Sequence, residues 1–188
     1  MQRSQKTEQL ELLKKEVAKC SQCPELRKRK NAVFGVGNSD ADIILIGEAP
    51  GADEDEQGIP FVGQAGEWLN DIITKSHLKR EDVFICNILC CRPPENRNPH
   101  AQEAKHCRPF LDKTLDIVKP KVLCCLGAVA AERLLGSQYT TIDDMRGKTF
   151  DYNGIAVICT HHPKARMDNE TKLKDMLKDF QSVIKAAK

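Results

Sequence analysis

Apolar residues gather in four short runs along the chain, and within each run almost every position is aliphatic, β-branched or cysteine. Runs of this length and composition are typical of strands that are buried on both faces of a sheet. The predicted strands are Asp42–Ile46, Val83–Ile88, Val122–Leu126 and Ala156–Thr160.

Between these runs the apolar positions recur every three or four residues, which is the period of a helix with one buried face. The predicted helices cover 64–77, 101–118, 127–136 and 171–187, and a further helix from Gln5 to Ala18 precedes the first strand. Strands that alternate with helices indicate a parallel sheet covered on both faces. The sequence therefore predicts an α/β fold: a three-layer α/β/α sandwich with a central four-stranded parallel sheet, in one domain spanning 1–188. Asn153-Gly154 after a short extended piece predicts a small extra hairpin.

The connection after the first strand is long, from Gly47 to Gly66, and reads GEAPGADEDEQGIPFVGQAG. A long loop at the carboxyl end of a buried strand is where open α/β sheets hold their ligands. We therefore expect this loop to form part of the functional site. Its glycines are compatible with a phosphate cradle and its acidic run, Asp53–Glu56, with a metal site.

Composition limits the class of protein. The formal net charge of +2 over 188 residues excludes a strongly basic nucleic-acid coat protein, although a local basic face remains compatible with it. The run Arg27–Lys30 is either such a phosphate contact or a solvated surface segment. No apolar stretch approaches the roughly 20 residues that span a bilayer, and the charged N-terminus has no signal-peptide core. We expect a soluble, cytoplasmic protein with no membrane association.

Nine cysteines are many for a chain of this kind. Four lie inside the apolar strand runs and are interpreted as core residues: Cys86, Cys124, Cys125 and Cys159. The remaining five are Cys20, Cys23, Cys90, Cys91 and Cys107. One C-x-x-C pair with two distant single cysteines favours an iron–sulfur cluster, whereas zinc more often takes two close pairs. Cys90 competes with Cys91, but it extends the strand alternation and is interpreted as a core or supporting residue.

These motifs together resemble the family 4 uracil-DNA glycosylases of prokaryotes. The resemblance covers nearly the whole chain, in order: Cys20-x-x-Cys23, GEAPG (47–51) with GIPFVGQAG (58–66), Asn87, CRPPENRNP (91–99), Cys107 and the His-Pro of THHPKAR (160–166). It implies a monomeric enzyme that binds uracil-containing DNA, double- or single-stranded. The implied reaction removes uracil, leaves an abasic site and does not cut the strand. The implied cofactor is a [4Fe–4S] cluster held by Cys20, Cys23, Cys91 and Cys107.

The resemblance also implies roles for residues of the site. Phe61 would stack on the flipped base, and the Asn87 amide would read uracil O4 and N3–H. His162, preferred over His161 for the His-Pro register, would donate to uracil O2, with help from backbone N–H groups of Gly47 to Ala49. Glu48 would orient the attacking water. Because DNA is negatively charged, the acidic run Asp53–Glu56 is then better explained as a solvated turn that stays away from the DNA.

The chain departs from the family after the His-Pro, where a leucine-rich wedge is usual and Lys164-Ala165-Arg166-Met167 stands instead. Met167 or Arg166 would serve as the wedge, and Lys164 and Arg166 would contact phosphates. Two alternatives stay open: a glycosylase for another base, such as hypoxanthine or xanthine, or a non-catalytic iron–sulfur module that binds uracil-DNA.

Overall fold

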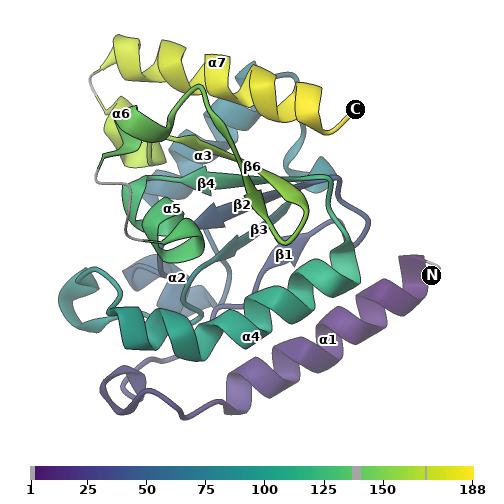
Figure 1. Ribbon diagram of the computed structural model, residues 1–188. Helices are drawn as coiled ribbons and strands as arrows, with labels where there is room; N and C mark the ends of the chain where they lie inside the picture. The colour runs from purple at the N-terminus through teal and green to yellow at the C-terminus, as the bar shows by residue number, and fades with distance from the viewer. Residues whose placement is uncertain (1–2, 137–140, 168) are drawn as a thin grey trace.

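The computed structural model describes residues 3–136, 141–167 and 169–188, and Figure 1 shows a twisted sheet between two layers of helices. Four strands form the parallel centre: β2 (Ile43–Gly47), β3 (Phe84–Asn87), β4 (Val122–Leu126) and β6 (Ile155–Thr160). The strand order is β1-β3-β2-β4-β6-β5. All four predicted strands are present, with ends that differ by one residue or less.

The sheet has six strands rather than the predicted four, because a short antiparallel strand is added at each edge. These are β1 (Val36–Gly37), which pairs with β3, and β5 (Thr149–Tyr152), which pairs with β6. The predicted hairpin is confirmed: Asn153 and Gly154 join β5 to β6 with φ values of 53° and 83°. Both residues are in the left-handed region, as the tight turns of two-residue hairpins require.

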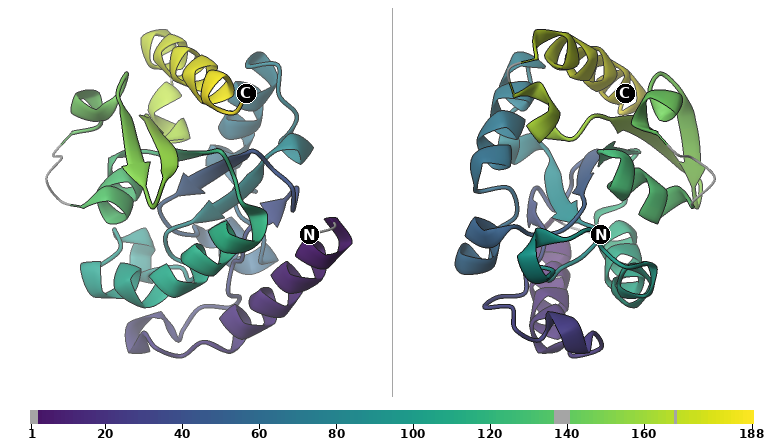
Figure 2. Two further views of the ribbon diagram at one scale, coloured as in Figure 1. Left: turned by 45° about the vertical axis from the view of Figure 1, so that its right-hand side comes forward. Right: turned by 90° about the vertical axis from the view of Figure 1, so that its left-hand side faces the viewer.

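Two hydrophobic clusters separate the layers. The helices α3 (Gln64–Lys75) and α7 (Glu170–Ala186) cover one face through side chains such as Leu69 and Phe180. The opposite face carries α4 (Ala101–Val118), α5 (Ala128–Leu135) and α6 (Ile142–Met145), and α1 (Arg3–Lys19) packs against α4. The three-layer sandwich is therefore confirmed, and the two views of Figure 2 show the sheet enclosed from both sides.

The parallel strands end at one edge, the left of Figure 1, and the connections gathered there are the irregular ones. They hold α2 (Ala52–Gln57) and the short 3-10 turns η1 (Pro24–Leu26), η3 (Pro94–Asn96) and η4 (Pro163–Arg166), while η2 (Arg80–Asp82) precedes β3. Within the described residues, no helix is both long and apolar enough to cross a bilayer. The four cysteines assigned to the core are buried, with exposed fractions of 0–7%.

Candidate active site

A cavity of about 390 Å³ opens at the carboxyl ends of the parallel strands. Its walls come from the loop after β2, the end of β3, the segment 93–98 and the end of β6. The lining residues are Glu48, Ala49, Pro50, Gly51, Glu54, Phe61, Ala65, Asn87, Pro93, Asn96, Arg97, Asn98, His162 and Lys164. The long glycine-containing loop is thus one wall of a cavity, as its position after a buried strand predicted.

Phe61 forms an aromatic surface in this cavity. Its side chain is 7% exposed, and its ring centroid lies 6.3 Å from that of His162 with the two planes tilted by 31°. Gly47 makes this arrangement possible, because a Cβ there would overlap the Phe61 ring and the Asn87 amide oxygen. Phe61 also has a φ of 53°, a left-handed conformation that a bulky residue rarely adopts and that often marks a functional site.

Asn87 ends β3 and is 5% exposed. Its Nδ2 atom is buried and has no hydrogen-bond partner among the described residues. A buried donor without a partner costs about 1–3 kcal/mol, so native structures rarely keep one without a purpose. The Asn87 amide therefore has hydrogen-bonding capacity to offer to a bound molecule.

His162 follows β6 and presents a neutral imidazole to the cavity. Its Nδ1 atom accepts a hydrogen bond of 3.2 Å from the backbone N–H of Lys164, so the ring proton resides on Nε2. Burial, together with the positive charge of Lys164, lowers the pKa of His162 to about 4. The ring can therefore donate from Nε2 at neutral pH without carrying a charge.

The neighbouring His161 faces away from the cavity. It is 3% exposed, and its Nε2 lies 3.5 Å from the carboxylates of both Asp143 and Asp175 and 3.2 Å from Lys172 Nζ. Adjacent residues at a strand end point to opposite sides. Only His162 of the two thus reaches the cavity.

Glu48 is the carboxylate of the turn directly after β2, and it lines the cavity. Burial raises its pKa above the ordinary glutamate value, and the positive charge of Arg133 on α5 partly counteracts this. Its carboxylate makes no hydrogen bond to another described residue. It is therefore free to hold a water molecule or a ligand hydroxyl.

The acidic run Asp53–Glu56 is not a solvated turn, and that prediction was wrong. It forms α2, whose first and last acids are exposed and whose middle two acids hold the loop. Glu54 accepts hydrogen bonds of 3.0 Å from the backbone N–H groups of Gly51, Val62 and Gly63. Gly51 and Glu54 have the spacing of a capping box, and this spacing could have predicted that Glu54 binds the backbone of the loop.

The segment 93–98 was not predicted to line the cavity. Pro93, Asn96, Arg97 and Asn98 do so from the loop between β3 and α4. Arg97 fastens that loop, because its guanidinium bonds the Glu103 carboxylate at 2.7 and 2.9 Å and the Glu25 carboxylate at 2.9 Å. The loop begins at Cys91 of the cysteine motif, so the spacing of its residues predicted a metal site. It gave no indication that the same loop also lines the cavity.

The three residues assigned to DNA contact are placed differently from one another. Lys164 is exposed at the mouth of the cavity, and Met167 is 55% exposed beyond η4. Arg166 forms an ion pair with Asp71 of α3, and only 22% of its side chain is exposed. Its guanidinium therefore anchors η4 to α3. We had expected this group to be unpaired and available to a phosphate.

Four cysteines that are distant in sequence lie near one another beside the N-terminal half of α4: Cys20, Cys23, Cys91 and Cys107. Burial, together with the neighbouring Cys107, Cys20 and Cys23, raises the pKa of Cys91 to about 12, although the positive charge of Arg29 opposes the rise. Cys23 behaves alike: burial and then Cys107 raise its pKa to about 11. The four sulfurs are therefore close enough to repel one another as thiolates.

Within 3–136, 141–167 and 169–188, no group of three or more His, Cys, Asp or Glu residues could hold a single metal ion. The donor type of the four residues, the cysteine thiol, is the one that iron–sulfur clusters use. In a cluster each thiolate binds a different iron atom, so the four ligands stand farther apart than around one ion. Cys91 faces the C-x-x-C pair, whereas Cys90 lies beside Cys86 and donates to the Cys107 sulfur.

Comparison with known proteins adds a family to this geometry. The model of the "Uracil DNA glycosylase superfamily" matches residues 34–187. The chain is similar to the type-4 uracil-DNA glycosylase of Archaeoglobus fulgidus, with 37% identity over 94% of this chain and 92% of that protein. A protein of the same description from Thermotoga maritima is 40% identical over 87% of this chain and 86% of its own length. A type-5 uracil-DNA glycosylase of Pyrobaculum aerophilum is more distant, at 26% identity.

Proposed function

The chain belongs to the uracil DNA glycosylase superfamily, and on this premise we propose that it removes uracil from DNA by hydrolysing the N-glycosidic bond. The product is an abasic site in an intact strand. The observation that carries the proposal is a single cavity that combines the unpaired Asn87 amide, the Phe61 ring and the neutral His162. Flipping the base out of the helix costs a few kcal/mol, which the contacts in this cavity offset.

Recognition of the base follows from the first two residues. Stacking on an aromatic ring is worth about 1–3 kcal/mol per base and does not depend on which base it is. Asn87 adds selectivity, since an amide can donate to uracil O4 and accept from uracil N3–H at once. An unpartnered Nδ2 supports this role, because the bound base supplies the acceptor that it lacks.

Cleavage leaves negative charge on the departing uracil and positive charge on the sugar. His162 Nε2–H is the donor for uracil O2, and a fixed donor of this kind is worth about 10²–10³-fold in rate. Glu48 holds the attacking water and, when ionised, offsets the charge of the sugar, which contributes about 10²–10⁴-fold. Glu48 and Ala49 line the cavity, so backbone N–H groups of the Gly47 to Ala49 turn are placed to assist.

We propose a [4Fe–4S] cluster held by Cys20, Cys23, Cys91 and Cys107. Four cysteine thiols are the donor set that such clusters take, and the nearby Glu103 carboxylate is already paired with Arg97. When bound, the cluster supplies a cross-link between the segment after α1, the 91–99 loop and α4. Since the 91–99 loop also lines the base cavity, the cross-link holds one wall of the active site.

The DNA partner is expected at the edge where the strands end. Lys164 contacts a phosphate, and the exposed Met167 enters the space that the flipped base leaves. We further propose that residues 1–188 form one domain that acts as a monomer on single- or double-stranded DNA in the cytoplasm of a prokaryote.

The test is an excision assay on a duplex with one uracil, followed by alkali to cut the abasic site. Wild-type protein should yield a cleaved strand only after alkali, and absence of that product would refute the proposal. Asn87→Ala should lower excision about 10- to 100-fold, as expected for the loss of about 1–3 kcal/mol of base recognition. Gln181→Ala, an exposed amide on α7, is the matched control and should leave excision unchanged. Duplexes with hypoxanthine or xanthine measure the base range.

A further inference from the structure

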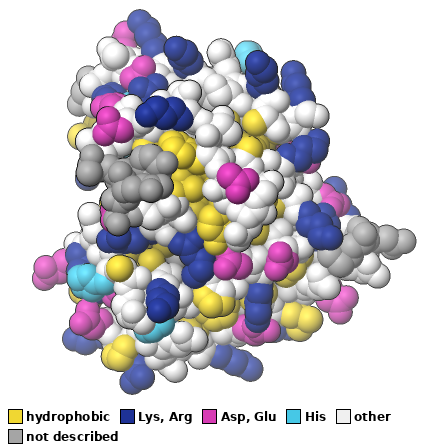
Figure 3. Space-filling model, in the orientation of Figure 1, with side chains coloured by type: hydrophobic (Ala, Val, Ile, Leu, Met, Phe, Trp, Pro, Cys, Tyr) yellow, Lys and Arg dark blue, Asp and Glu magenta, His cyan; other side chains and the backbone are white. Residues whose placement is uncertain are grey.

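A second cavity, of about 370 Å³, lies between the end of α1 and residues 27–32. Four of its nine lining residues are cationic, namely Lys19, Arg27, Arg29 and Lys30, and among the described residues no carboxylate lines it. On the face drawn in Figure 3, by contrast, Lys and Arg side chains are interspersed with Asp and Glu. A hollow that concentrates one sign of charge in this way attracts anions.

The cations of this hollow keep hydrogen-bond donors free. Arg29 is fixed in place because its Nη2 donates to the backbone oxygens of Cys20 at 2.7 Å and Ala18 at 3.3 Å. Its Nε and Nη1 atoms make no hydrogen bond to a described residue. Arg27 has one long contact of 3.4 Å to Ser21 O, and Lys19 has no described partner. Only Lys30 shares its charge, with the exposed Glu56.

The hollow is joined rigidly to the active-site loop. The buried Asp55 carboxylate of α2 accepts from Lys30 N at 3.0 and 3.2 Å and from Asn31 N at 3.2 Å. Asn31 Nδ2 in turn donates to the backbone oxygens of Asp55 at 2.8 Å and Glu56 at 3.0 Å. Since Glu54 of the same helix lines the base cavity, α2 stands between the two cavities.

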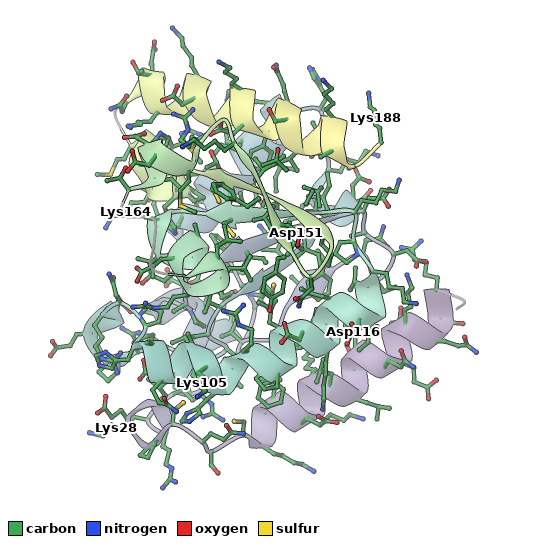
Figure 4. The ribbon with its side chains drawn as sticks, in the orientation of Figure 1. Lys28, Lys105, Asp116, Asp151, Lys164 and Lys188 are labelled. Carbon is green, nitrogen blue, oxygen red and sulfur yellow. The ribbon has the colours of Figure 1, made fainter. Side chains whose placement is uncertain are left out.

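The separation suits a continuous strand of DNA. A helix is about 10–12 Å across with its side chains, and duplex DNA advances about 3.4 Å per nucleotide. The width of α2 alone would therefore place a phosphate in the hollow roughly three to four nucleotides from the flipped base. In Figure 4, Lys28 of the basic segment and Lys164 of the cavity mouth lie at the same edge of the molecule, while Lys188 lies at the opposite edge.

We propose that this hollow is a second DNA-contact site, in which Lys19, Arg27 and Arg29 bind a backbone phosphate several nucleotides from the uracil. The inference rests on the proposed function, because it requires DNA at this edge of the sheet. The base cavity supplies selectivity, and the hollow supplies affinity that does not depend on sequence. Asp55 then has a function beyond packing, since it holds the basic segment at a fixed distance from the cavity.

The test measures binding to a uracil-free duplex of about 20 base pairs by fluorescence anisotropy, between about 50 and 200 mM salt. The variant is Lys19→Gln with Arg27→Gln, two exposed side chains outside the base cavity. We expect about tenfold weaker binding and a plot of log K against log salt that is shallower by about 1–2. The matched control, Lys185→Gln with Lys188→Gln, changes the net charge equally at the opposite edge and should shift affinity less than about twofold.

Equal affinities and salt slopes for the variant and the control would overturn the proposal. So would a variant that loses thermal stabilisation by inorganic phosphate while its DNA binding is unchanged, because the hollow would then bind a free anion. Circular dichroism and iron content check that the variant is folded. Because the duplex contains no uracil, the result stands apart from the excision assay: loss of affinity without any excision would sink only the proposed function. On a strand of about three nucleotides with the uracil at its centre, which cannot reach the hollow, variant and wild-type excision should be equal.

Discussion

The base cavity and the group formed by Cys20, Cys23, Cys91 and Cys107, here called the cysteine corner, are two sites that are built in different ways. The cavity is assembled from residues at the ends of buried strands, and its shape is set by the packing of Gly47, Phe61 and Asn87. The cysteine corner has no strand to position it. Its four thiols come from two loops and from α4. Burial and neighbouring thiols raise the pKa of Cys23 and Cys91, whereas a hydrogen bond from Cys90 lowers the pKa of Cys107.

The two sites therefore differ in what fixes the positions of their side chains. A site on strand ends inherits its geometry from the hydrophobic core, so it exists before any ligand binds. The cysteine site brings together two buried thiols, Cys91 and Cys107, and two partly exposed ones, Cys20 and Cys23. Metal ligation requires such thiols to be deprotonated, so the binding of a metal adds to the free energy of folding of the loops that carry them. The sheet therefore determines the base cavity, whereas the loop that forms one of its walls is held by Arg97 and Glu103, and the proposed cluster would add to that hold.

The largest effect should come from the cysteine corner. Cys91→Ala should remove essentially all iron and the absorption near ~400 nm, because a cluster of this type requires four thiolates. Cys90→Ala, at the adjacent position, should keep both, since Cys90 faces Cys107 and Cys86 and not the C-x-x-C pair. Iron analysis of anaerobically purified protein checks this. Zinc in the wild-type protein, or iron loss in both variants, would contradict the assignment.

The two histidines give the next test, within the base cavity. His162→Ala should lower the rate of excision about 10²–10³-fold, the usual effect of removing one donor to a developing anion. His161→Ala should change that rate by less than about tenfold, because its partners are Asp143, Asp175 and Lys172 outside the cavity. Single-turnover kinetics separates this chemical step from DNA binding. A larger loss for His161 would reverse the assignment of the donor.

The pH dependence of excision should show one rising limb. Burial raises the pKa of Glu48, so the active carboxylate forms only above the ordinary glutamate range. With a pKa of about 4, His162 is already neutral there and adds no second limb near neutrality. Glu48→Gln should remove the limb along with about 10²–10⁴-fold of the rate.

Stability should respond to the same carboxylate with the opposite sign. A folded-state pKa above the unfolded value means that stability is fully present below the unfolded pKa and is lost as pH rises through the folded pKa. Glu48→Gln should therefore raise the free energy of unfolding at pH 7 while it lowers activity. Denaturant unfolding at two pH values measures this. A destabilised Glu48→Gln protein would indicate that the carboxylate has a structural partner.

The smallest effect is expected at the exposed wedge. Met167→Ala should slow excision from a duplex only a few-fold, because its side chain replaces part of the stacking of one base. Excision from a single strand should be unchanged, since no partner strand is displaced. The ratio of the two rates is the measurement, and equal losses on both substrates would assign Met167 to another task.

Much of this site could be read from the sequence because the signals were local. The apolar runs specified the four parallel strands, and strand ends are where side chains such as Asn87 and His162 leave the sheet. The C-x-x-C pair and the 91–99 motif were equally local. What local patterns could not reveal was which side chains were already paired: Arg166 has the character of a phosphate contact but forms an ion pair with Asp71, 95 residues earlier in the chain.

By itself the sequence determined the fold class and the loop that lines the cavity, because each depends on residue type and on spacing along one segment. Only the tertiary structure decided three further points. Asp55 joins the basic segment 27–30 to α2, the 93–98 loop lines the cavity, and His161 points away from it. Those outcomes depend on contacts between distant segments, such as the hydrogen bonds from Lys30 and Asn31 to Asp55. Burial then set the chemistry: it kept His162 neutral and raised the pKa of Glu48.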